Sequence, residues 1–139
     1  MECRAYRVAS SVPNGQGDSG LKGLHVLVVE DSWHVANALK TLLEELGIDV
    51  AGPAASLQDA ERLLEARQPH VAIVDINLKG EMAYGLIDAL HGRGVRVVVI
   101  SGYAVPQVAQ SKVAAILQKP FSAKSLLAVL REAAADQAR

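Results

Sequence analysis

Short apolar runs alternate along the chain with stretches in which apolar residues recur at helical spacing. The runs at residues 26–29, 71–74 and 95–100 are rich in Val and Ile and contain no alternating polar positions. This pattern is typical of parallel strands that are covered on both faces of a sheet. Weaker strand candidates lie at residues 49–52 and 114–117.

Five helices are expected between and after these strands. Two of them begin at a serine suited to capping, Ser56 and Ser122. Asp59 follows Ser56 by three residues, which resembles a capping box. Gly47 is expected to end the first helix, because glycine readily adopts the conformation that follows a helix. The apolar spacing predicts helices over residues 35–46, 57–64, 82–90, 105–110 and 126–133.

Strands and helices in alternation predict an α/β domain with a doubly wound parallel sheet of five strands, (βα)5. Right-handed crossovers favour the strand order 2-1-3-4-5, which is the flavodoxin-like arrangement. A length of 139 residues suits one domain, and 50% of the residues are hydrophobic, which is enough to form a core. We expect a flexible tail over residues 1–22, which are rich in Gly and Ser, and one folded domain over residues 23–139.

Charge and composition argue against several classes of protein. The formal net charge is -1 and the sequence has no block of Lys and Arg, so direct binding to nucleic acid is not expected. No apolar run approaches the roughly 20 residues of a membrane span, and the N-terminus does not have the pattern of a secretion signal. The lone Cys3 cannot form an internal disulfide. We therefore expect a cytoplasmic protein without membrane contact.

Polar residues stand at the carboxyl end of each long predicted strand and of the weaker last one. Ligands of doubly wound sheets bind beyond these ends, so the side chains are expected to converge on one rim. They comprise three carboxylates, one hydroxyl and one amine. The residues are Glu30, Asp31, Asp75, Ser101 and Lys119, with Asn77 two residues after Asp75.

This combination suits phosphoryl transfer. Clustered carboxylates repel one another unless a cation neutralises them, and Mg²⁺ prefers a few carboxylates together with water and phosphate oxygens. An aspartate can act as the nucleophile and form an aspartyl phosphate, while an amine stabilises charge on the transferring oxygens. A hydroxyl at Ser101 would bond a phosphoryl oxygen only after Asp75 is modified. The pattern therefore predicts a switch.

These residues, in this order, resemble the receiver domain of bacterial response regulators over roughly residues 24–135. The motifs that carry the resemblance are the acidic pair after the first strand, the strand-ending Asp75, Ser101-Gly102-Tyr103 and Lys119-Pro120-Phe121. The resemblance implies Asp75 as the phosphoacceptor, a switch hydroxyl at Ser101 and a phosphate-pairing Lys119. It also implies Mg²⁺ as the cofactor, held by Glu30, Asp31, Asp75 and the main-chain carbonyl of Asn77.

The resemblance further implies a stand-alone signalling module of a two-component system or phosphorelay. It would not be an enzyme, apart from its own phosphorylation and dephosphorylation at Asp75. A sensor histidine kinase or a histidine phosphotransfer protein would supply the phosphoryl group. Because only one helix and a short tail are expected after Lys119, we expect no output domain. Binding a downstream protein partner and passing the phosphoryl group on both stay open.

The sequence departs from the family pattern at two places. Many receivers have Met-Pro shortly after the phosphoacceptor, where this chain has Leu78-Lys79-Gly80. Many also place Tyr or Phe three residues before the lysine, where this chain has Ile116. An aliphatic side chain has no ring to swing inward, so the switch is expected to use Ser101 and the backbone after it. Tyr103 is the aromatic residue there that can substitute.

Other functions and roles fit parts of the pattern. A flavodoxin-like electron carrier would need a loop rich in Ser, Thr and Gly where Glu30 and Asp31 stand. An aspartate-nucleophile phosphatase typically has a second Asp where Asn77 stands, and a receiver that only binds partners would not need Asp75 and Lys119. Local roles also stay open: Asp31 or Ser32 can cap the first helix, and Trp33 is either a partly buried aromatic or a neighbour of the phosphate site. The four histidines lie on separate elements without metal-ligand spacing.

Overall fold

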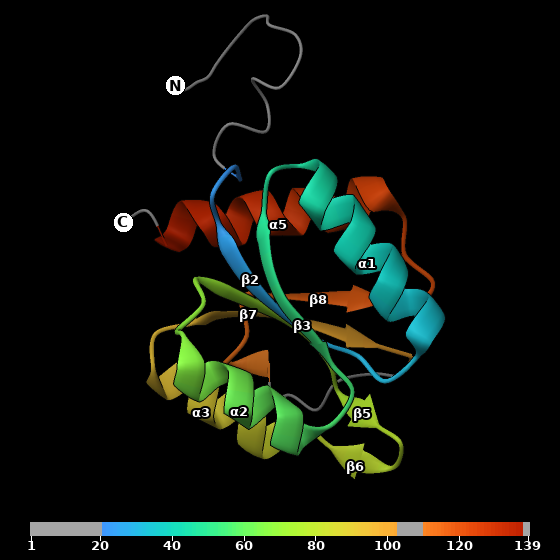
Figure 1. The fold of residues 1–139 in the computed structure, drawn as a ribbon, viewed down its shortest axis with the longest axis vertical. Coiled ribbons are helices and arrows are strands. Elements are labelled where there is room, and N and C mark those ends of the chain that lie inside the picture. Colours follow the sequence, from blue (N-terminus) through green and yellow to red (C-terminus); the bar gives the residue numbers. More distant parts are fainter. Residues whose placement is uncertain (1–20, 103–109, 138–139) are drawn as a thin grey trace, which may run out of the picture.

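The computed structural model describes residues 21–102 and 110–137, and its centre is a parallel five-stranded sheet (Figure 1). The strand order is β3-β2-β4-β7-β8. Numbered in chain order without the small second sheet, this is the expected order 2-1-3-4-5, so the predicted flavodoxin-like fold is confirmed. The strands are β2 (His25–Val29), β3 (Asp49–Ala54), β4 (Val71–Asp75), β7 (Arg96–Ser101) and β8 (Ala115–Gln118).

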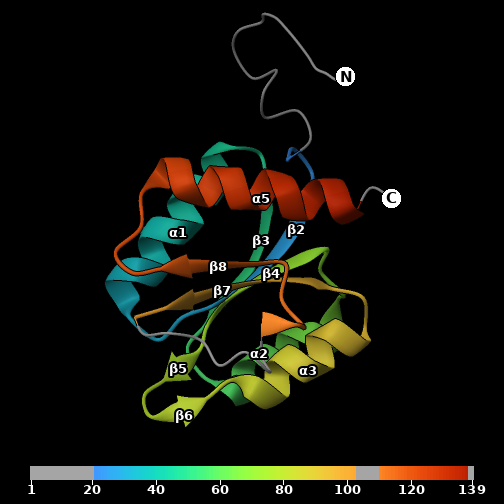
Figure 2. The same ribbon diagram turned by 180° about the vertical axis from the view of Figure 1, so that it is seen from behind.

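Helices cover both faces of this sheet (Figures 1 and 2). Helices α1 (Trp33–Glu45) and α5 (Ala123–Gln137) lie on one face, and α2 (Leu57–Ala66) and α3 (Tyr84–Gly92) lie on the other. The side chain of Ser56 accepts a hydrogen bond from the Asp59 amide at 3.1 Å, and Ser122 accepts one from the Ser125 amide at 3.0 Å. Both predicted serine caps are therefore present. No helix in the described part of the chain has the length and apolar character needed to cross a membrane.

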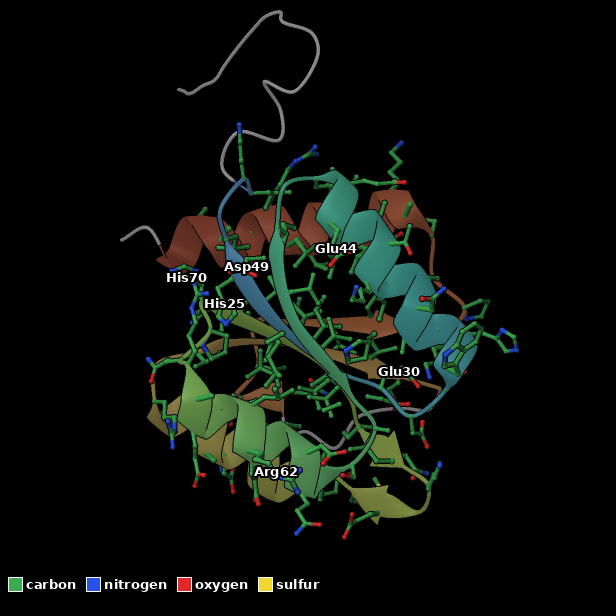
Figure 3. The ribbon with its side chains drawn as sticks, viewed as in Figure 1. His25, Glu30, Glu44, Asp49, Arg62 and His70 are labelled. Atoms are coloured by element: carbon green, nitrogen blue, oxygen red, sulfur yellow. The ribbon has the colours of Figure 1, made fainter. Side chains whose placement is uncertain are left out.

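The amino end of the sheet carries a polar cluster that lies far from Glu30 (Figure 3). The ring of His25 is buried, and its Nδ1 lies 3.6 Å from a carboxylate oxygen of Asp49. Arg67 forms an ion pair with the same carboxylate at 2.8 Å, and the imidazole of His70 accepts a hydrogen bond from the backbone N–H of His25. Burial and the nearby Arg67 charge lower the pKa of His25.

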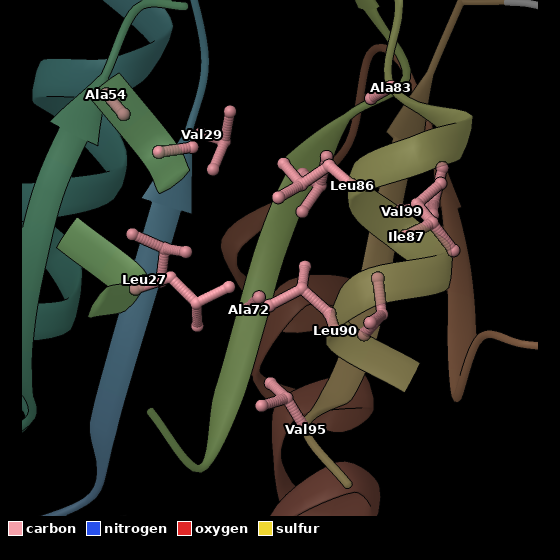
Figure 4. Packing of buried hydrophobic residues seen from close by; sticks show 14 of the residues in the cluster. Leu27, Val29, Ala54, Ala72, Ala83, Leu86, Ile87, Leu90, Val95 and Val99 are labelled. Carbon is pink, nitrogen blue, oxygen red and sulfur yellow. The ribbon is translucent and has the colours of Figure 1, made fainter. Parts of the chain in front are cut away.

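The core has two layers because successive side chains of each strand point to opposite faces of the sheet. Figure 4 shows the layer beneath α2 and α3, in which Leu27 and Val29 of β2 belong to the same buried cluster as Leu86 and Leu90 of α3. On the opposite face, alternate residues of the same strands pack against Leu39 and Leu43 of α1 and Leu126 and Leu130 of α5. The apolar runs are thus buried on both faces, as their lack of alternating polar positions predicts.

One element departs from the prediction. A two-stranded antiparallel hairpin, β5 (Asn77–Leu78) and β6 (Glu81–Met82), follows β4, and α3 begins only at Tyr84. The prediction that Met82 starts the third helix is therefore wrong. Met82 is in phase with the apolar residues of that helix, but it is exposed and sits in β6.

Two further expectations fall wholly or largely outside the described residues. They are the flexible tail, except for its last two residues, and the helix over residues 105–110, except for its last residue. Leu21, which the expected boundary assigns to the tail, is buried in the core layer of α1 and α5.

Candidate phosphoacceptor site

Parallel pairing brings the polar residues at the strand ends together. Asp75 is the last residue of β4 and is registered with Ile100, which directly precedes Ser101 in β7. The backbone N–H of Lys119 donates to the carbonyl of Ser101 at 2.8 Å, which joins the end of β8 to the end of β7. Glu30 follows β2, which pairs with β4. The predicted convergence on one rim is what the fold produces.

Lys119 is the central cation of this rim. Its Nζ lies 3.2 Å from Glu30 Oε1 and 3.1 Å from Asp75 Oδ2. Burial lowers the pKa of Lys119, but the hydrogen bond to Asp75 and the charge of Glu30 outweigh that effect and raise it overall. The amine therefore remains charged and is held between two carboxylates. The Lys119–Pro120 peptide bond is cis.

Glu30 is an unusual acid because its side chain is fully buried. Burial raises its pKa, although its Oε2 accepts a hydrogen bond from the Ser32 amide at 2.9 Å, which acts in the opposite direction. Ser32 is the N-cap residue of α1 but forms no capping hydrogen bond through its own side chain. The local sequence thus turns Glu30 inward at the start of α1.

The acidic residues suit a divalent cation. One ligand atom from each of Glu30, Asp31 and Asp75 lies within 4.8 Å of the others. Glu30 Oε1 is buried and accepts no hydrogen bond among the described residues, although Lys119 lies close enough for an ion pair. Hard cations such as Mg²⁺ prefer oxygen ligands of this kind. The three carboxylates therefore fit the expected cofactor.

Two more predicted residues lie at the same rim. The backbone N–H of Asn77 donates to Asp75 Oδ1 at 3.1 Å, so Asn77 is adjacent to the carboxylate. Ser101 is 1% exposed at the end of β7. The structure thus brings Glu30, Asp31 and Asp75 together with Asn77 and Lys119, and it places Ser101 beside them.

The two uncertain switch positions have different outcomes. Ile116 on β8 is 39% exposed, so its side chain is only partly packed. Tyr103 lies outside the described residues. Position 116 therefore has an aliphatic residue at a partly open site, and the role of Tyr103 stays a prediction.

One open alternative is resolved, because Trp33 is 71% exposed and so is not a partly buried aromatic. Its ring meets that of His34 edge-on, with centroids 5.3 Å apart. Trp33 also lines a small cavity of about 200 Å³ together with Glu30 and Asp31. An exposed aromatic therefore stands beside the acidic pair.

Sequence reasoning missed a groove between α1 and α5 that reaches the site. Its volume is about 620 Å³, and its lining includes Lys119, Val35, Leu42 and Phe121. Val35, Leu42 and Phe121 are only half-buried. The sequence signal for this groove is weak, because the same apolar residue types occur at the edge of a helical apolar stripe and at its centre.

Comparison with known proteins agrees with this fold. The sequence model of the response regulator receiver domain family matches residues 26–131, so the chain belongs to this family. The transcriptional regulatory protein DesR of Bacillus subtilis (strain 168) is 29% identical over 84 residues. That alignment covers 60% of this chain and 42% of DesR, so the chain spans less than half of this relative.

Solved structures show the same similarity. A CheY-like receiver domain from Methylobacillus flagellatus has a TM-score of 0.73 and 25% identity, and the match covers 81% of this chain and 99% of that one. A response regulator from Burkholderia pseudomallei, solved with a phosphorylated aspartic acid, a calcium ion and citrate, has a TM-score of 0.70 and 28% identity. That match covers 81% of this chain and 69% of the other.

Proposed function

We propose that Asp75 accepts a phosphoryl group from a histidine kinase or a histidine phosphotransfer protein. The observation that carries this proposal is the position of its carboxylate, which lies close to the carboxylates of Glu30 and Asp31 and 3.1 Å from the amine of Lys119. One carboxylate oxygen attacks phosphorus, and the new O–P bond forms as the P–N bond to the donor imidazole breaks. The imidazole leaves as a neutral ring that keeps the proton on its other nitrogen. The product is an aspartyl phosphate.

The surrounding residues stabilise the charge on the transferring oxygens. Glu30, Asp31, Asp75 and the main-chain carbonyl of Asn77 would hold Mg²⁺, and the cation would neutralise charge on the phosphoryl oxygens. The amine of Lys119 is fixed 3.1 Å from Asp75 and can bond a phosphoryl oxygen attached there. Preorganised positive charge of this kind is the main source of catalysis in phosphoryl transfer.

Ser101 is proposed as the switch residue. Ser101 is buried at the end of β7, directly after Ile100, which is paired with Asp75. Its carbonyl accepts a hydrogen bond from the backbone N–H of Lys119, the residue whose amine binds the Asp75 carboxylate. Its hydroxyl would therefore move toward a phosphoryl group on Asp75 and shift the backbone after it. Ile116 has no ring to rotate, so the switch would not use an inward-swinging aromatic at that position.

The test is incubation with acetyl phosphate and MgCl₂, followed by intact-mass measurement. The expected result is the gain of one phosphoryl group by the wild-type protein, and no gain in EDTA or in Asp75→Asn. Ser101→Ala should still gain the phosphoryl group, but phosphorylation should change its hydrogen exchange less than in the wild type. Ile116→Val should behave like the wild type in both measurements. No gain in the wild-type protein would refute the proposed function.

A further inference from the structure

The β5–β6 hairpin is joined to the phosphoacceptor by two consecutive hydrogen bonds. Asp75 Oδ1 accepts from the backbone N–H of Asn77 at 3.1 Å. The side-chain oxygen of Asn77 then accepts from the backbone N–H of Gly80 at 2.8 Å. Figure 1 shows the hairpin projecting from the rim of the sheet, beyond the start of α2. A short path therefore links a buried carboxylate to an exposed turn.

The turn of this hairpin has a constrained backbone. Lys79 has φ 53° and Gly80 has φ 87°, and two successive residues with positive φ are typical of the type I′ turn. Lys79 is the sole non-glycine residue with positive φ in the described part of the chain. A side chain disfavours this conformation, so the rest of the hairpin must hold it in place.

The base of the hairpin provides that support. Leu78 is 3% exposed and packs in the core layer of α2 and α3. The backbone N–H of Ala83 donates to the carbonyl of Ile76 at 2.9 Å, which closes the base. Asn77 is therefore held by Asp75 through its backbone N–H and by the turn through its side chain.

We propose that Asn77 is a positioning residue whose side chain lets the type I′ turn set the affinity of the site for Mg²⁺. This inference rests on the proposed function, in which the main-chain carbonyl of Asn77 binds the cation. If the turn at Lys79 relaxes, the Asn77 side chain loses its bond to Gly80 and the carbonyl is no longer held in place. The apparent affinity then falls with the fraction of molecules that keep the turn.

The coupling has a consequence at the surface, because an effect of the turn on cation affinity requires an equal effect of the cation on the turn. Lys79 and Glu81 are exposed, and they line an open groove of about 510 Å³ whose other wall is Ala55 and Ser56 at the start of α2. Occupation of the buried site would therefore change the stability of an exposed wall of this groove.

A matched pair of variants at position 79 tests the proposal. Lys79→Asn and Lys79→Val remove the same charge, but Asn tolerates positive φ whereas the β-branched Val does not. The side chain of residue 79 is exposed and is not a proposed cation ligand. We expect Lys79→Asn to bind Mg²⁺ at least about threefold more tightly than Lys79→Val in calorimetric titrations. Equal affinities, or tighter binding by Lys79→Val, would overturn the proposal.

A second measurement on the wild-type protein covers the case in which Lys79→Val does not fold. The Gly80 amide should exchange with solvent at least about fivefold more slowly in saturating Mg²⁺ than in EDTA. An unchanged exchange rate in a protein that binds Mg²⁺ would refute the inference alone. A wild-type protein that binds no Mg²⁺ would refute the proposed function and this inference with it.

Discussion

Replacing Lys119 by methionine removes the cation that separates two buried carboxylates. Two unit charges at the observed 3.1 Å attract by about 5 kcal/mol at an effective dielectric constant of about 20. Desolvation and the exposure of 30% of the Lys119 side chain offset most of this attraction. We therefore expect Lys119→Met to lower the free energy of unfolding in EDTA by about 2 kcal/mol.

A divalent cation should reverse part of this loss. Mg²⁺ would neutralise Glu30 and Asp75 in the variant without competition from the amine, so the variant should gain at least about 1 kcal/mol more from Mg²⁺ than the wild type. Urea unfolding in EDTA and in saturating MgCl₂ measures both quantities. Lys112→Met is the matched control, because it loses an exposed ion pair with Asp88 at 2.6 Å and should lose less than about 1 kcal/mol in either buffer. Equal stability of Lys119→Met and wild type in EDTA, or equal gains from Mg²⁺, would refute the reasoning.

Three other predictions test separate parts of the structure. Gly52 has φ 95° and a Cβ there would lie 2.8 Å from two backbone atoms, so Gly52→Ala should lose about 1–3 kcal/mol or more in urea unfolding. The pKa of buried His25 is below its ordinary value, so the unfolded chain binds more protons there and stability should fall as the pH drops below about 6.5. His25→Gln should flatten that pH dependence, and an unchanged profile would contradict this assignment. Asp31→Asn should weaken Mg²⁺ binding, as measured by Trp33 fluorescence, more than Glu30→Gln does. The reverse order would make Glu30 the more important cation ligand.

The sequence predicts most of the fold because strand and helix signals are separate in this chain. Runs such as residues 71–74 have no polar interruption, and Ser56 and Ser122 mark helix starts with side chains that do cap them. The convergence of Asp75 and Lys119 also follows from sequence, because parallel strands end at one edge.

The remaining features depend on tertiary contacts that local pattern does not encode. The hairpin after Asp75 is missed because Lys79-Gly80 is a weak turn signal and Met82 has the phase of the helix that follows. The ion pair between Glu30 and Lys119 joins residues far apart in the chain, so no spacing rule identifies it. The exposure of Trp33 likewise depends on how α1 lies against the sheet.

Chemical mapping of the modified residue tests the central claim most directly. Borohydride reduces an acyl phosphate to an alcohol, so treatment after incubation with acetyl phosphate and Mg²⁺ marks the acceptor permanently. Peptide mass analysis of the wild-type protein should then find the reduced side chain at Asp75 and at no other carboxylate. The reduced residue should appear only when Mg²⁺ is present during the incubation. Reduction at Glu30 or Asp31 instead, or at no carboxylate, would contradict the assignment of Asp75 as the phosphoacceptor.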